Sequence, residues 1–248
     1  MTVYTHYFHM EEQANVVYLP QRPNGFAIIL LSDNDRTVEK NSSIWERHPE
    51  RHSFLLSLLE EGYTVIASQL FGKHWGSERA CEYMEQLHHY LVKKQILNEK
   101  FHFFAEGAGA LVVLKLLEKR PQLIRSAFLL NPCIYLERIF QEEKQSKLFF
   151  KRFIQELSAA HGVEENDVTK EYCQAFIQFE HWVDCAPIHI YHMMADKRFK
   201  VASHSRPFEQ EFVKKNLPVS LSLYGLGKSF SSFKQPVRSF FKKNEKKL

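Results

Sequence analysis

The sequence contains no apolar run long enough to cross a lipid bilayer. Its longest mostly apolar run is ALVVLKLL, well short of the ~20 residues that a membrane-spanning helix needs. The first residues, MTVYTHYFHMEEQ, also lack the basic start and following apolar run of a secretory signal peptide. We therefore expect a cytoplasmic protein.

Closely spaced cysteines are also missing. The chain has four cysteines, which are Cys81, Cys133, Cys173 and Cys185, and they form no Cys-x-x-Cys pair. A zinc site would need tighter spacing. The histidine pairs do not form a metal site either. His88 and His89 diverge on a predicted helix, and His189 and His192 lie on opposite faces of a predicted strand. We expect free thiols in a reducing compartment, and neither a metal nor a cofactor.

The chain also lacks the uniformly basic character of a nucleic-acid binder. It has 33 Lys and Arg against 29 Asp and Glu, which gives a net charge of +4. The surplus lies after Gly227, in KSFSSFKQPVRSFFKKNEKKL, and the rest is near balance. No nucleic-acid partner is therefore expected. Contact of this basic tail with a membrane surface is the alternative to a simply solvated lysine face.

What the sequence does contain is an alternation of short apolar or β-branched runs with longer helical patterns. This alternation is typical of βαβ units and a mostly parallel sheet. Its 248 residues are enough for one sizeable core, so we expect a single α/β domain over 1–248. Eight strands are predicted, at 2–8, 15–20, 26–31, 63–68, 101–105, 126–131, 187–194 and 218–224.

One segment breaks the alternation. Two helical patterns follow each other between Leu136 and Trp182, which predicts a helical cap insertion over 136–185. The first pattern holds Leu148, Phe149, Phe153 and Leu157, and the second holds Val168, Tyr172, Phe176, Phe179 and Trp182. Either these aromatic stripes are ordinary core, or some of them line a pocket as a lid.

The stretch FHFFAEGAGALVVLKLL has the form of a strand, a sharp turn and a buried helix, which is the context of a nucleophile elbow. Such an elbow needs a small residue on each side of the nucleophile, because the turn is strained and lies close to neighbouring strands. With Gly107 at the apex, the flanks are Ala105 and Gly109. With Glu106 there, one flank would be Phe104, which is too large. Gly107 is therefore predicted at the nucleophile position, where it offers no attacking side chain.

Two later stretches complete a resemblance to the α/β-hydrolase superfamily, in particular to its esterase-like and peptidase-like members. PIHIYHMMADKRF resembles the strand and turn that carry the catalytic acid, often as His-Gly-x-x-Asp, and Asp196 falls at the acid. SLYGLGKSF resembles the family's Gly-x-Gly-His-x-Phe stretch, with Lys228 where the histidine belongs. These positions follow the family's chain order of nucleophile, acid and histidine. The resemblance covers roughly residues 16–235.

Two loops extend the resemblance and also qualify it. The family's oxyanion loop, often His-Gly-Gly, follows the third strand, where this chain has Ser32, Asp33 and Asn34. A carboxylate has the wrong sign for stabilising developing negative charge. The stretch SQLFGKHWGSE resembles the loop before the second helix of esterase-like members. Its matching residues are Gly72, His74, Trp75 and Gly76.

The resemblance implies the α/β-hydrolase fold, a mostly parallel eight-stranded sheet with flanking helices, a helical cap and a final helix with its basic tail at 231–248. It also implies a degenerate triad that keeps Asp196 and has lost its nucleophile and its histidine. In a serine hydrolase, losing either group costs about 10⁶ in turnover, or about 8 kcal/mol. We therefore predict a pseudoenzyme that acts by binding a ligand or a partner protein.

Two alternatives remain open at this point. The chain could be an active hydrolase of esters or amides with relocated chemistry, and nothing in the spacing selects among the candidates. Those candidates are Ser32, Cys133 and Glu106 as nucleophiles, and His74, His192 and Lys228 as bases. Lys228 could instead pair with Asp196 and fill the vacated space.

A bound ligand would be a small molecule, and the predicted site favours an anionic one. The helix after Gly107 offers free backbone N–H groups and the positive end of its dipole, with Lys228 nearby. The candidate ligand-binding residues are Ser32, His74, Glu106, Ala108 and Lys228.

Overall fold

The computed structural model describes residues 4–32 and 36–245. Asp33 and Asn34 of the predicted oxyanion loop, and the last three residues of the basic tail, lie outside the described residues. Within the described part, no helix is both long and apolar enough to cross a membrane.

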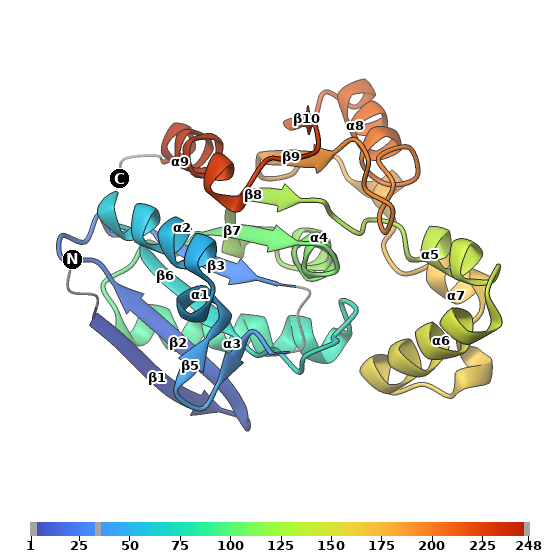
Figure 1. Cartoon of the computed structure of the whole chain (residues 1–248), viewed down its shortest axis with the longest axis horizontal. Helices are drawn as coiled ribbons and strands as arrows, with labels where there is room; N and C mark the ends of the chain where they lie inside the picture. Colours follow the sequence, from blue (N-terminus) through green and yellow to red (C-terminus); the bar gives the residue numbers. More distant parts are fainter. Residues whose placement is uncertain (1–3, 33–35, 246–248) are drawn as a thin grey trace.

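Eight strands form one sheet in the order β1-β2-β6-β3-β7-β8-β9-β10 (Figure 1). They are β1 (Tyr4–Met10), β2 (Gln13–Leu19), β3 (Ala27–Leu31), β6 (Thr64–Ser68), β7 (Phe101–Glu106), β8 (Ile124–Leu130), β9 (Ile188–Met193) and β10 (Val219–Tyr224). The first two strands pair antiparallel, and all pairs from β6 to β10 are parallel. The predicted mostly parallel, eight-stranded sheet is therefore confirmed.

Helices cover both faces of this sheet. On one face lie α2 (Pro49–Glu60) and α9 (Lys234–Lys243), and on the other lie α3 (Glu78–Lys94), α4 (Gly109–Lys119) and α8 (Ser205–Lys214). Strand β3 shows why its whole length is apolar: Ile28 packs with the first group of helices and Ile29 with the second. A strand buried on both faces has no position left for a polar side chain.

A small hairpin and a short helix, which the sequence analysis did not predict, follow β3. The hairpin pairs β4 (Val38–Glu39) with β5 (Ser42–Ser43), and it leads into α1 (Ile44–Arg47). The Ser43 hydroxyl caps α1 by accepting from the Trp45 N–H, and the Trp45 side chain is fully buried. Two-residue strands are too short to produce a detectable pattern.

Three helices follow β8 and lie beyond the carboxyl ends of the strands (Figure 1). They are α5 (Leu136–Glu143), α6 (Lys147–His161) and α7 (Lys170–Gln174), and we call residues 136–174 the helical insertion. Its apolar side chains form a separate cluster that also includes Trp75, Ala108 and Leu111 of the body. The insertion is therefore packed against the turn that follows β7.

The second predicted helix of the insertion is wrong in extent. Helix α7 ends at Gln174, and only a 3₁₀ turn, η3 (Phe179–His181), follows it. Lysine side chains from the body hydrogen-bond the backbone that follows Gln174. Lys115 Nζ donates to the Phe176 carbonyl at 2.5 Å, and Lys215 Nζ donates to the Phe179 carbonyl at 2.7 Å. These bonds replace the intrahelical ones that the aromatic spacing had suggested.

Gly109, at the start of α4, lies against the backbone of β3. A Cβ at this position would lie 3.0 Å from the Leu31 carbonyl oxygen, and a backbone atom in a central strand cannot easily move away. We expect Gly109→Ala to lower the free energy of unfolding by about 1–3 kcal/mol, measured by urea denaturation. Gly225→Ala is the matched control because its Cβ would meet only Met194 Cε at 3.9 Å, and a loss as large as that of Gly109→Ala would contradict this packing.

His102 on β7 makes stability depend on pH. Burial, followed by the nearby charge of Arg125, lowers its pKa to about 3, and its Nδ1 lies 2.7 Å from Ser126 Oγ. Below its usual pKa of about 6.5, the unfolded chain binds a proton that the folded chain refuses, so stability falls with pH. Between pH 8 and 5, urea denaturation of the wild type should show about 2 kcal/mol more loss than His102→Gln. The control variant His9→Gln, at an exposed histidine, should lose as much free energy of unfolding between pH 8 and 5 as the wild type.

Candidate functional site

The turn between β7 and α4 has the geometry of an elbow whose apex carries no side chain. Gly107 has φ +49°, in the left-handed region that favours glycine. Its N–H donates to the Leu130 carbonyl at 3.1 Å, and its carbonyl accepts from the Cys133 N–H at 2.9 Å. These two bonds tie the apex to the end of β8. The turn presents only backbone at the position predicted for a nucleophile.

The residue before the apex, Glu106, is held in a bidentate ion pair. The two guanidinium nitrogens of Arg51 donate to its two carboxylate oxygens at 2.8 and 2.7 Å. Arg51 in turn lies over the rings of Trp45 and Phe230, at 4.9 and 4.8 Å from their centroids. Both partners are largely buried, so this is a strong, geometrically specific pair. The ion pair with Arg51 occupies both oxygens of Glu106, one of the nucleophiles considered from the sequence.

The three predicted triad positions come together around one cleft of about 440 Å³. Gly107, Asp196 and Lys228 all line it, although they come from the turns after β7, β9 and β10. Parallel strands bring their carboxyl ends to the same edge of the sheet, which is why residues so far apart in the sequence meet there.

Lys228 does not pair with Asp196, so that expectation is wrong. One carboxylate oxygen of Asp196 accepts from the backbone N–H groups of Arg198 and Phe199, at 2.8 and 3.0 Å. The Lys228 side chain is exposed, and its Nζ lies 3.5 Å from the Tyr191 hydroxyl. Within residues 4–32 and 36–245, no ion pair joins the two residues.

A serine, a histidine and an aspartate do line up beside the cleft. Ser205 Oγ lies 2.6 Å from His192 Nδ1, and His192 Nε2 lies 3.9 Å from an Asp196 carboxylate oxygen. His192 Nε2 also lies 2.7 Å from the Phe199 carbonyl, which only accepts, so Nε2 carries the proton and Nδ1 accepts from Ser205. Burial lowers the pKa of His192. Ser205 and His192 expose no surface, so this set holds the turn after β9 and reaches no substrate.

Ser32, Cys133 and His74, which were also predicted as nucleophiles or a base, are buried as well. Ser32 and His74 are 6% and 3% exposed, and Cys133 is fully buried. The His74 ring accepts from the Gly76 N–H at 3.1 Å and hydrogen-bonds the backbone of Ser32. Burial and nearby His161 lower the His74 pKa to about 4. His74 thus shapes its own loop, and a base enclosed in this way has no free nitrogen for catalysis.

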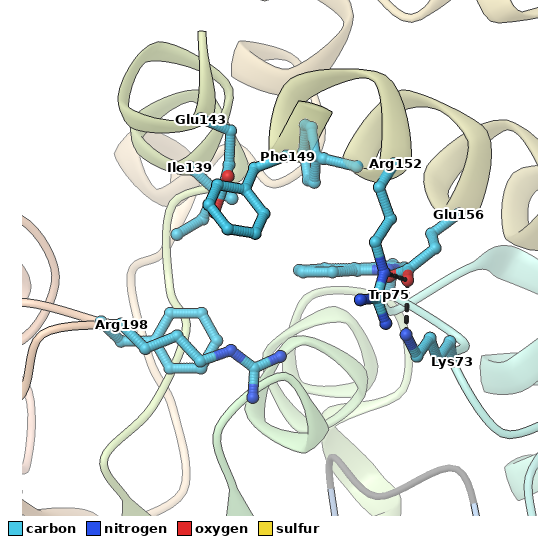
Figure 2. A pocket seen from close by; sticks show the side chains of 10 residues that line it. Lys73, Trp75, Ile139, Glu143, Phe149, Arg152, Glu156 and Arg198 are labelled. Carbon is cyan, nitrogen blue, oxygen red and sulfur yellow. Dashed lines mark hydrogen bonds and ion pairs between the residues drawn. The ribbon is translucent and has the colours of Figure 1, made fainter. Parts of the chain in front are cut away.

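A second cleft, of about 490 Å³, lies between the helical insertion and the body (Figure 2). Its apolar walls include Trp75, Phe149 and Phe153, and Trp75 meets Phe153 edge-on with centroids 5.3 Å apart. Phe149 and Phe153 therefore line a pocket, while Phe153 and Leu157 also belong to the buried core of the insertion.

Charged side chains form the rest of this second cleft. Lys73 and Arg152 both pair with Glu156, the latter at 2.8 Å, and the Trp75 indole N–H donates to the same carboxylate at 3.3 Å. Burial tends to raise the pKa of Glu156, but the hydrogen bonds from Lys73 and Arg152 hold it below its usual value. Figure 2 shows Arg198 extending into the space from the opposite side.

The two clefts share Arg198 and Phe199, on the turn after β9. A third, much smaller pocket beside them is lined by Ala108, His74 and again Arg198. Sequence reasoning missed Arg51, which belongs to no motif of the resemblance, and Arg198, which lies two residues beyond the acid position in PIHIYHMMADKRF but has no role there in the resemblance. In the described part of the chain, no three His, Cys, Asp or Glu residues lie close enough together to hold a metal ion.

Comparison with known proteins supports the fold through structure and not through sequence. No protein-family model matches the chain, and no curated protein matches its sequence. Solved structures do match. Est1E from Butyrivibrio proteoclasticus is 13% identical with a TM-score of 0.63, over 97% of this chain and 98% of that one. FphF, a fluorophosphonate-binding serine hydrolase of Staphylococcus aureus, is 14% identical with a TM-score of 0.65, over 99% of both chains.

A third similar structure is an acylaminoacyl peptidase from Pyrococcus horikoshii. It is 12% identical with a TM-score of 0.72, and the match covers all of this chain but only 42% of the peptidase. Identities this low show the fold alone. Together with the eight-stranded sheet, the elbow after β7 and the flanking helices, they identify this chain as having the fold of the α/β-hydrolase superfamily.

Proposed function

We propose that this chain is a catalytically impaired, esterase-like protein that binds a ligand beside its elbow and does not turn it over by a serine mechanism. The observation that carries the proposal is the glycine at the apex. Gly107 provides a backbone in the conformation of an elbow, but no hydroxyl, thiol or carboxylate that could attack a substrate.

The surroundings of Gly107 support the same proposal. The neighbouring carboxylate of Glu106 is neutralised by Arg51, and Asp196 is bound to two backbone amides. Lys228, at the position of the base, extends to Tyr191 at the surface. Losing the nucleophile or the base of a serine hydrolase costs about 10⁶ in turnover, or about 8 kcal/mol. With both groups missing, we expect almost no hydrolysis by a serine mechanism.

The clefts on either side of Arg198 support a binding role. They have not been filled by side chains, and they keep about 490 and 440 Å³ of space. A guanidinium suits a carboxylate, sulfonate or phosphate, and the aromatic rings of Trp75, Phe149 and Phe153 suit an apolar body. The ligand class that fits best is a small amphipathic anion.

A cytoplasmic location belongs to the same proposal, and the four free, buried cysteines support it.

The purified chain should hydrolyse p-nitrophenyl acetate and butyrate no faster than buffer, and a fluorophosphonate probe should not label it. The positive control is the double variant Gly107→Ser with Lys228→His, which restores the two missing groups beside Asp196 and should accept the label. The matched variant Gly107→Ala with Lys228→His should not.

Two outcomes would count against this account. Ester hydrolysis well above buffer, abolished by Ser32→Ala, Cys133→Ala or His74→Gln, would establish relocated catalysis. A folded Gly107→Ser/Lys228→His variant that takes no label would count against the assignment of these positions.

Binding is tested with an aromatic anion, 1-anilinonaphthalene-8-sulfonate, whose fluorescence rises in an apolar site. We expect saturable binding that Arg198→Gln weakens by about 10-fold or more, the size of a lost hydrogen bond to a charged group. Lys200→Gln is the matched control, because Lys200 lies two residues away, pairs with Glu142 at 3.2 Å and lines neither cleft. Equal weakening by both variants would contradict a specific role for Arg198.

A further inference from the structure

Helix α6 begins with two large apolar side chains that remain exposed. Leu148 is 74% exposed and Phe149 is 59% exposed, although Phe153, Ile154 and Leu157 of the same helix are buried. A helix that packs on a core normally keeps its apolar residues on one face. Leu148 breaks this rule, because it lies on the face that α6 turns to solvent.

The same turns of α6 concentrate positive charge. Residues 144–152, KQSKLFFKR, contain four basic residues and no acidic one, which are Lys144, Lys147, Lys151 and Arg152. The remainder of the helical insertion has eight acidic residues and only two basic ones. All four of these cationic side chains are exposed. The insertion is thus acidic except where its apolar side chains emerge.

Cationic and apolar side chains share one face of the helix. Lys151 and Arg152 follow Leu148 by three and four residues, so they flank it on the helix surface. Phe149 lies beside this face and also lines the 490 Å³ cleft with Arg152 (Figure 2). The exposed apolar pair is therefore bordered by cations on one side and by the cleft on the other.

We propose that the first two turns of α6 dock the helical insertion on an anionic lipid surface. Leu148 and Phe149 would enter the boundary between headgroups and acyl chains, and Lys147 and Lys151 would lie against lipid phosphates. Helices that lie in a membrane interface combine these two kinds of side chain. Basic residues beside an anionic leaflet add attraction that salt screens.

The position of the patch favours a lipid surface over a groove on another protein. The insertion lies at one end of the molecule, beyond the strands (Figure 1). Two side chains at the start of a helix suffice for shallow insertion, whereas a stable protein interface needs about 800 Å² from each partner. Docking here brings the cleft beside Phe149 next to the lipid surface, and it does not depend on whether the elbow hydrolyses a substrate.

In the described part of the basic tail, the apolar side chains pack against the sheet and the charged ones are partly paired. In α9, Val237 and Phe241 are fully buried against the sheet, and Arg238 and Lys242 both pair with Glu61. The start of α6 is thus a better candidate for membrane contact than the tail.

Vesicle sedimentation of the full chain tests this inference. The protein should bind vesicles made of equal parts phosphatidylcholine and phosphatidylglycerol, bind phosphatidylcholine alone much less, and dissociate as salt is added. Leu148→Ser with Phe149→Ser should weaken binding to the mixed vesicles by about 10-fold or more. Lys147→Gln with Lys151→Gln should remove the preference for the anionic lipid.

Matched variants separate this site from other exposed groups. Ile96→Ser and Val183→Ser remove side chains that are 99% and 92% exposed elsewhere, and both should bind like the wild type. A chain ending at Asn244, which lacks the last lysines, should also bind. The inference is overturned if the wild type does not sediment with anionic vesicles, if the Leu148/Phe149 variant binds unchanged, or if only the truncation removes binding.

Discussion

The close approach of the elbow to its neighbouring strands is the constraint on which the site depends. A Cβ on Gly109 would lie 3.0 Å from the Leu31 carbonyl oxygen, and Gly107 is hydrogen-bonded to Leu130 at the end of β8 and to Cys133 just after it. Small residues and a left-handed apex satisfy this constraint whether or not a nucleophile is present. The packing of the turn therefore does not require a nucleophile, and in this chain the apex residue carries no side chain.

The carboxylates on either side of this apex are held by hydrogen bonds. Arg51 neutralises Glu106 between two aromatic rings, and backbone amides hold Asp196. A buried carboxylate without such partners would be costly. Arg198 lines both clefts, and in the cleft below the helical insertion an anion with an apolar body would find this guanidinium beside aromatic rings. The same insertion that encloses one cleft carries the exposed start of α6, which places that cleft beside the proposed lipid contact.

The sequence was sufficient for the sheet and for bringing the turns after β7, β9 and β10 to one cleft at its edge, because both rest on local patterns. Apolar runs located all eight strands, and the need for small residues around the apex selected Gly107 over Glu106. It failed where distant side chains decide the outcome. Helix α7 stops early because Lys115 and Lys215 from the body bind the backbone that follows it. Lys228 turns to Tyr191 because backbone amides already hydrogen-bond Asp196. No local sequence pattern identifies Arg51 as the partner of Glu106, because the two residues are far apart in the chain.

Intact-mass spectrometry after an acid quench tests most directly whether the elbow lacks a nucleophile. The chain would be incubated with p-nitrophenyl butyrate, quenched, weighed and then mapped by peptide digestion. A covalent mechanism traps an acyl group on its nucleophile even where turnover is slow. We predict no butyryl adduct on any residue beside the elbow. An adduct of one butyryl group on Ser32, Cys133 or Glu106 would contradict it.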